Sequence, residues 1–334
     1  MRTLLRRPRT STLALAGFFL AVVTVFSALS PIFRSAENIL NILTDYSHIG
    51  ILAVGMAFPI LVRGIDLSVG AVMGLAGMAA FDMLLRYNLP GAVVIVAVLV
   101  IGAAAGAVNG LLVVGLRLNP FVATLATMAG FRGLTYAISG RQLDRNLSTA
   151  SIEDPTFLGI DGAIGSIPLA FVYLVVLAGL AHVMLTHTRV GLDIYSVGGN
   201  ERAAHLAGIR VARTKLITFT LSGFAAAIAG LVITARLQTS PEDLGMTAEL
   251  SAIAAAVIGG VSLQGGIGGT TGPVLGAFLI GTIYVGMTLE NVDRYLQPVV
   301  AGLILIGAIA YDRFTTIRGQ RRLRRNLGLE PVST

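Results

Sequence analysis

The chain contains no cysteine and no tryptophan, and few of its 334 residues are charged. Without cysteine it forms no disulfide and holds no metal through thiolates, although this absence says nothing about its compartment. Charged residues make up 12% of the chain and hydrophobic residues 55%, whereas soluble domains carry about 25% charged residues. This composition excludes a soluble globular protein.

Signatures of the common enzyme classes are also missing. The sequence has no HExxH zinc motif, no GxSxG nucleophile turn and no GxxxxGK[ST] phosphate loop. His48, His182, His187 and His205 are scattered, and no pair of carboxylates stands out as the acid and base of a glycosidase. We therefore expect no catalytic residue, no metal site and no cofactor, and a membrane enzyme is a weak alternative.

Apolar runs recur along the chain at about 17–25 residues, the length at which a helix crosses a bilayer. They predict an all-α integral membrane protein with about ten transmembrane helices, forming one transmembrane domain over residues 13–312. The expected spans are Leu13–Leu29, Asn38–Leu61, Leu67–Leu85, Pro90–Leu116, Pro120–Ser139, Ile167–Leu185, Leu216–Ala235, Ala248–Ser262, Val274–Leu289 and Tyr295–Tyr311.

The eighth of these segments is unusual, because Ala248–Ser262 is too short to span without help and a glycine-rich stretch, Gln264–Pro273, follows it. Irregular backbone at membrane depth is tolerated only where protein or a water-filled cavity surrounds it. The count of ten depends on this segment.

Glycines mark two further features. Gly102, Gly106 and Gly110 recur at four-residue spacing, which predicts a face that lets another helix approach closely. The stretch Gly70–Gly74 is similar to Gly272–Gly276, and this similarity indicates a possible parallel internal repeat of the kind found in transporters.

The net charge is +7, but the basic residues lie in short loops beside apolar runs, which is the positive-inside pattern rather than a nucleic-acid surface. A cytoplasmic N-terminal segment, residues 1–12, and a cytoplasmic basic tail, residues 313–334, both fit this pattern. With ten spans and both termini in the cytoplasm, the inside segments hold roughly 17 of the 24 basic residues. Those in the loops are Arg63, Arg117, Arg189, Arg202, Arg210, Arg213 and Lys215.

One long polar stretch, Gly191–Lys215, interrupts the apolar chain. Asn200 can cap a helix of about two turns over Glu201–Ala207, and Gly208 can end it. A helix this short has no stability of its own in water, so the membrane body or a partner must hold it. An ordinary solvated loop is the alternative interpretation.

Three motifs carry a family resemblance. The stretch GGNERAAHLAGI, Gly198–Ile209, closely resembles the cytoplasmic coupling segment of the ribose/galactose-type permeases of ATP-binding-cassette (ABC) importers, in the superfamily of branched-chain-amino-acid and sugar permeases. The GIDLSVG signature of the same family stands at Gly64–Gly70, and a third match runs from Glu249 to Gly266. The resemblance extends from about Asn38 to Tyr311.

This resemblance implies the permease subunit of a bacterial inner-membrane importer that carries a monosaccharide, a pentose or a hexose, into the cytoplasm. Its expected partners are a separate ABC ATPase subunit, a periplasmic sugar-binding protein and a second permease copy or a related permease, within a lipid bilayer. The residues expected to couple to the ATPase are Gly199, Asn200, Glu201, Arg202, Ala203, Ala204, Leu206, Gly208 and Ile209.

Polar residues inside the apolar runs are candidates for the translocation pathway, because they are costly in hydrocarbon and usually face a pathway or a partner. They are Asp66, Ser68, Asn109, Thr124, Thr127, Ser222, Glu249 and Ser251. With no tryptophan, only Phe and Tyr can stack on a sugar ring.

Two other classes stay open. An ion-coupled secondary transporter of a small polar solute more often has an ionisable residue in mid-span, whereas Asp66, Asp82 and Glu249 fall near predicted helix ends. A structural membrane scaffold has no need of the coupling segment.

The chain departs from the family pattern at three positions. Arg63 precedes GIDLSVG where a small or polar residue is usual, Ser251 replaces an acid, and Ile267 replaces a lysine. These departures put in doubt the transfer of detailed roles to the region around Ser251 and Ile267.

Overall fold

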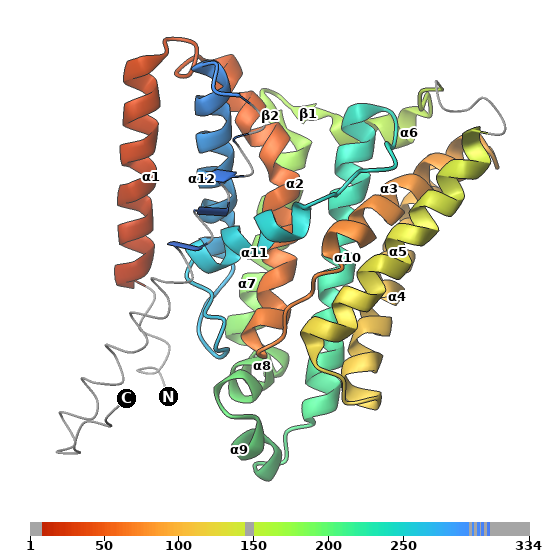
Figure 1. Cartoon of the computed structure of the whole chain (residues 1–334), viewed down its shortest axis with the longest axis vertical. Helices are drawn as coiled ribbons and strands as arrows, with labels where there is room; N and C mark the ends of the chain where they lie inside the picture. Colours follow the sequence, from red (N-terminus) through yellow and green to blue (C-terminus); the bar gives the residue numbers. More distant parts are fainter. Residues whose placement is uncertain are drawn as a thin grey trace.

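A computed structural model describes residues 9–143 and 150–293, together with positions 296, 299, 300, 302, 303, 306 and 307. Most of the N-terminal basic segment, most of the predicted tenth span and the whole basic tail therefore lie outside the described residues. Helices dominate the described part (Figure 1), as the composition predicts.

The long helices are α1 (Arg9–Leu29), α2 (Ala36–Leu61), α3 (Val69–Leu85), α4 (Gly91–Gly115), α5 (Pro120–Leu143), α7 (Leu169–His187), α10 (Val211–Leu237) and α12 (Thr271–Leu289). The short elements are α6 (Pro155–Leu158), the 3-10 turn η2 (Gly159–Asp161), the strands β1 (Ala163–Ile164) and β2 (Ile167–Pro168), α8 (Arg189–Gly199), α9 (Glu201–Leu206) and α11 (Ala248–Ile258). The two strands pair antiparallel, with Ile164 opposite Ile167.

Six of the described helices are long and apolar enough to cross a membrane: α2, α4, α5 up to Gly140, α7, α10 and α12. Shorter apolar helices cover Leu15–Leu29 and Val69–Leu85. The protein is thus an all-α membrane protein built from several apolar helices, while the count of ten spans and the orientation of the termini stay predictions.

Helix α10 lies at the centre of the bundle and packs against α2, α3 and α4 (Figure 1). The predicted glycine face of α4 makes the closest of these contacts. A Cβ added at Gly102 would meet Ala227, and Cβ atoms at Gly106 and Gly110 would meet Phe219 and Leu216 of α10. The prediction of a helix-packing role for these glycines is confirmed.

The segment after α10 crosses the bundle as a broken element. Residues 238–247 run without helix from the end of α10 to α11, which is only 11 residues long, or about 16 Å at 1.5 Å per residue. Residues 259–270 then lead on to the start of α12. Because the hydrocarbon core is about 30 Å thick, α11 by itself does not span it, and the predicted eighth span is a short helix between two irregular connections.

Glycines make room for this broken element on both sides. Cβ atoms at Gly70 and Gly74 of α3 would meet the backbone of residues 244–249, and Cβ atoms at Gly272 and Gly276 of α12 would meet α11 and the glycine after it. The two similar glycine stretches therefore flank α11 from two helices, and the parallel repeat itself stays a prediction.

At the end of the bundle opposite α9, residues 150–168 contain α6, η2 and the β1–β2 hairpin. Asp154 accepts hydrogen bonds from Phe157 N at 2.8 Å and from Gly91 N at 3.2 Å, so it caps α6 and also binds the first residue of α4. The backbone of Ile152 donates to Gln238 O at 2.8 Å, which fixes this segment to the end of α10.

Candidate functional site

The predicted coupling helix is present as α9. The Asn200 side chain accepts a hydrogen bond from Ala203 N at 3.0 Å, which is the expected N-cap. The helix ends at Leu206, one residue earlier than predicted, and Gly208 follows with φ of 83°. That left-handed conformation is one that glycine adopts without strain, so both predicted helix boundaries rest on the residues that suggested them.

The flanking parts of the polar stretch are more helical than the sequence analysis expected. Helix α8 begins at Arg189, where the Thr188 hydroxyl accepts from Gly191 N at 3.3 Å. Helix α10 begins at Val211, five residues before the predicted start at Leu216. The sequence analysis did not predict these helices because the stretch from 189 to 215 contains many charged residues. In the structure those side chains lie on the exposed faces, while Ile194 and Val197 of α8 face the core.

Helix α9 projects from one end of the bundle (Figure 1). Ala204 is buried, whereas Leu206 is 82% exposed and its neighbours Arg202, Ala203 and His205 are exposed as well. An ion pair of 2.8 Å joins Glu201 to Lys215 of α10. Glu201 is half exposed, so this pair contributes less than about 1 kcal/mol. A single exposed leucine does not by itself mark an interface, so the docking role of α9 stays a prediction.

A junction of three backbone segments lies beside this helix. Arg63, in the turn between α2 and α3, donates from Nε to Gly198 O at 2.8 Å and from Nη2 to Gly199 O at 2.6 Å. These two carbonyls end α8, where the negative end of the helix dipole favours a cation. Gly266 N donates to Leu61 O at 2.9 Å and brings in the third segment.

Tyr195 strengthens the same junction from α8, because its hydroxyl donates to Gly268 O at 2.8 Å. Burial raises the pKa of the Tyr195 hydroxyl. Through Arg63 and Tyr195, the residues just before α9 are bonded to the α2–α3 turn and to the loop before α12. Sequence analysis named Arg63 as a cytoplasmic loop charge and as a departure from the family pattern, and it did not predict this contact.

Six of the eight predicted pathway residues converge inside the subunit: Asp66, Ser68, Asn109, Thr124, Thr127 and Ser222. Asp66 Oδ1 accepts from Ser68 N at 3.0 Å, from Ser68 Oγ at 2.7 Å and from Asn109 Nδ2 at 3.3 Å. Asp66 thus holds the turn that leads into α3, while the side chain of Ser68, the N-cap residue, makes no cap hydrogen bond.

Helices α4 and α5 complete this polar network. Asn109 Nδ2 donates to Ser68 Oγ at 2.7 Å, and Asn109 Oδ1 accepts from Thr127 Oγ1. Thr124 Oγ1 donates to Ile65 O at 3.0 Å. Asp66, Ser68, Asn109 and Thr124 are all 0% exposed, so the network joins the GIDLSVG turn to two helices in the interior of one subunit. A role in the pathway stays a prediction for these residues.

Glu249 and Ser251 lie apart from the network, on α11, and both are partly buried. Glu249 packs over Gly70 of α3. Arg132 of α5 donates to Leu244 O at 2.7 Å in the connection before α11. The sequence analysis missed Arg132, although a lone arginine in the middle of an apolar span is itself a signal of function.

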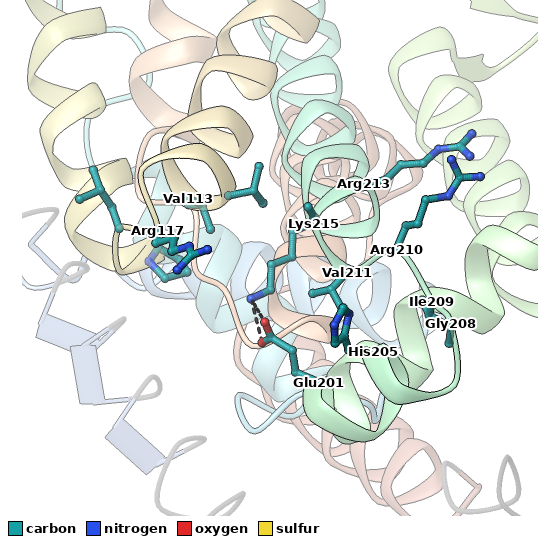
Figure 2. A pocket seen from close by; sticks show the side chains of 14 residues that line it. Val113, Arg117, Glu201, His205, Gly208, Ile209, Arg210, Val211, Arg213 and Lys215 are labelled. Carbon is teal, nitrogen blue, oxygen red and sulfur yellow. Dashed lines mark hydrogen bonds and ion pairs between the residues drawn. The ribbon is translucent and has the colours of Figure 1, made fainter.

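A cavity of about 850 Å³ lies between α9, the end of α4 and the start of α10. Figure 2 shows the Glu201–Lys215 pair and His205 on one side of it and Arg117 on the other. Its remaining lining mixes basic and apolar side chains: Val113, Val114, Leu118, Pro120, Ile209, Arg210, Val211, Ala212 and Arg213, with the backbone of Gly208. An acidic surface would complement this lining.

Comparisons with known proteins agree with these features. The family model for the permease component of branched-chain amino acid transport systems matches residues 38–309. The ribose import permease protein RbsC of Haemophilus influenzae is 38% identical over 299 residues, which are 88% of this chain and 90% of that protein.

Two relatives with other named substrates are similarly close. The D-allose transport system permease protein AlsC of Escherichia coli is 39% identical over 298 residues, 89% of this chain and 90% of that protein. The autoinducer 2 import system permease protein LsrC of Enterobacter sp. is 36% identical over 333 residues, 97% of this chain and 93% of that protein. No solved structure matches the chain.

Proposed function

Because this chain belongs to the family of permease components of branched-chain amino acid and sugar import systems, we propose that it carries a monosaccharide into the bacterial cytoplasm. Its family membership supports the ABC importer and not a stand-alone ion-coupled carrier. The sugar is a pentose or a hexose, as relatives named for ribose and for D-allose suggest.

The observation that carries this proposal is α9. A helix that is capped by Asn200, bonded to the core only through a few side chains and tipped by an exposed Leu206 fits a docking element for a separate ATPase. The chain has no phosphate-binding motif of its own, so ATP hydrolysis belongs to that partner. The basic lining of the cavity beside α9 favours an acidic surface on the ATPase.

The orientation of the chain in the membrane follows from charge. Arg63, Arg117, Arg189, Arg202 and the start of α10 place positive charge at the α9 end of the bundle. Under the positive-inside rule this end faces the cytoplasm, where ATP is available. The opposite end, which carries the β1–β2 hairpin, then faces a periplasmic sugar-binding protein in the inner membrane of a bacterium.

The outer faces of the bundle suit both a bilayer and a second copy. Val93, Val96 and Val100 of α4 form an exposed apolar row, and Phe121 and Val122 of α5 are exposed as well. A dimer, of two copies or of this chain with a related permease, completes the pathway in this proposal. The buried network around Asp66 and Asn109 supports the helices that line it.

The test is a purification of the tagged chain from gently solubilised native membranes, followed by uptake of radiolabelled ribose and D-allose in proteoliposomes. We expect a phosphate-loop ATPase to co-purify with the tagged chain in about equal amount. We expect sugar uptake to require both ATP and a sugar-binding protein. Uptake that persists without the ATPase and depends on a proton or sodium gradient would overturn the proposal.

A further inference from the structure

A second cavity, of about 290 Å³, lies between α2, α11 and α12 and is separate from the coupling region. Its polar and aromatic lining consists of Asp45, Tyr46, His48, Ser251 and Tyr284, and the rest is aliphatic: Ile49, Ile280 and Val285. Ser251 is thus a predicted pathway residue that lines this cavity from the short helix α11. The described side chains of the buried network around Asp66 line neither cavity.

The two tyrosines form an aromatic corner. The ring centroids of Tyr46 and Tyr284 are 6.4 Å apart with the planes at 63°, which is an edge-to-face arrangement. Gly281 makes this corner possible, because a Cβ there would collide with the Tyr46 ring. The glycine therefore has a specific steric function on α12.

Hydrogen-bonding groups surround this corner on the other sides. Asp45 is half exposed and holds Arg236 at 3.1 Å, and Arg236 also lies 3.6 Å from Asp161 at the end of the bundle opposite α9. His48 lies one turn further along α2, and Ser251 faces the cavity from α11. A carboxylate, an imidazole and a hydroxyl next to aromatic faces are the groups that bind neutral rings carrying several hydroxyls.

We propose that this cavity is a subsite for a neutral sugar ring in transit, in which Tyr46 and Tyr284 pack against the ring and Asp45, His48 and Ser251 bind its hydroxyls. The inference rests on the proposed function and names the place in the subunit where the sugar is held. Ser251 then contacts the substrate at the position where the family usually has an acid. A carboxylate there would bind the sugar, or a cation, more tightly than the Ser251 hydroxyl does. The irregular backbone on both sides of α11 is of the kind that membrane depth tolerates only where protein or a water-filled cavity surrounds it.

The natural absence of cysteine makes a direct test possible. Ser251→Cys introduces a single thiol, which is treated in proteoliposomes with a charged, membrane-impermeant thiol reagent from the side that binds the sugar-binding protein. We expect the reagent to label the introduced thiol of this variant, and millimolar ribose or D-allose to slow the labelling. We also expect the labelled protein to lose sugar uptake while the ATPase still hydrolyses ATP when the loaded binding protein is added. The matched control is Thr288→Cys, an exposed hydroxyl position one turn beyond Tyr284 on α12, whose labelling the sugar leaves unchanged.

A second pair of variants covers the case in which Ser251→Cys fails to fold. Tyr284→Phe keeps the ring, and we expect it to keep uptake, whereas Tyr284→Ala removes the ring and lowers uptake roughly tenfold, the scale of one aromatic contact. Full uptake by labelled Ser251→Cys, or equal uptake by Tyr284→Ala and Tyr284→Phe, would overturn the subsite. A wild-type protein that shows neither uptake nor stimulated ATP hydrolysis would instead overturn the proposed function.

Discussion

Arg63 offers the sharpest test of how α9 communicates with the membrane core. We predict that Arg63→Asn uncouples sugar transport from ATP hydrolysis while leaving the ATPase bound. Asparagine suits the position because Arg63 has φ of 64°, and Asn tolerates left-handed backbone better than most residues. The substitution therefore removes the side-chain contact without adding backbone strain, and it leaves the Asn200 cap of α9 intact.

The size of the expected uncoupling follows from the two hydrogen bonds that Arg63 donates to Gly198 O and Gly199 O, at 2.8 Å and 2.6 Å. A hydrogen bond from a charged donor contributes about 1.5–3 kcal/mol, and the partly exposed position of these two bonds favours the lower end. Together they contribute about 3 kcal/mol. At 1.4 kcal/mol per factor of ten, their loss shifts the equilibrium between an attached and a detached end of α8 by roughly a hundredfold.

The assay compares sugar imported per ATP hydrolysed in proteoliposomes that contain the ATPase and the binding protein. We expect Arg63→Asn to lower this ratio at least about tenfold, and Arg63→Lys, which can still bond one carbonyl, to give an intermediate value. Arg189→Gln is the control, because Arg189 is an exposed arginine at the start of α8, at the same end of the bundle, and lines neither cavity. An unchanged ratio in Arg63→Asn, or an equal loss in Arg189→Gln, would refute the reasoning.

Three further predictions concern other parts of the site. Asn200→Ala combined with Gly208→Ala removes the cap and strains the end of α9. We expect the double variant to lose sugar uptake, while membrane insertion, measured by fractionation, stays intact. Unchanged uptake would exclude the coupling hypothesis. Asn109→Ala leaves Asp66 without one of its donors and lowers the free energy of unfolding by about 1–3 kcal/mol. Size-exclusion chromatography of heated samples would then give a lower melting temperature. A melting temperature equal to that of the wild type would contradict this prediction. Gly74→Ala forces a methyl group against Leu244 O and lowers both stability and uptake, whereas Gly130→Ala on α5, where a Cβ meets nothing within 4 Å, changes neither; equal effects would exclude the packing argument.

Several features of this protein are local, and the sequence alone predicted them. The low share of charged residues, 12%, and the repeated apolar runs predict a membrane protein. The reason is that a helix needs about 20 mostly apolar residues to cross the hydrocarbon core. Asn200 and Gly208 bound α9 because capping depends on residues three or four positions apart. The glycine face of α4 was equally readable, since its spacing is that of one helix face.

Other features came from packing and had no local signal. Helix α8 looked like part of a loop because its charges lie outward and its buried residues, Ile194 and Val197, meet a core that only the folded bundle provides. The sequence marked the eighth apolar segment as too short to span without help and showed the glycine-rich stretch after it, but the 11-residue length of α11 and the irregular backbone before it came only from the structure.

The family motifs in the sequence determined that this protein is a membrane permease, and the caps of α9 placed the short helix that is predicted to couple to the ATPase. Only the tertiary structure decided that Arg63 bonds to carbonyls 135 and 136 positions away and that Ser251 shares a cavity with Tyr46 and Tyr284. The physical reason is that hydrogen bonding and close packing act over a few ångströms in space, and the helices that bring such residues together are placed by contacts among the whole bundle.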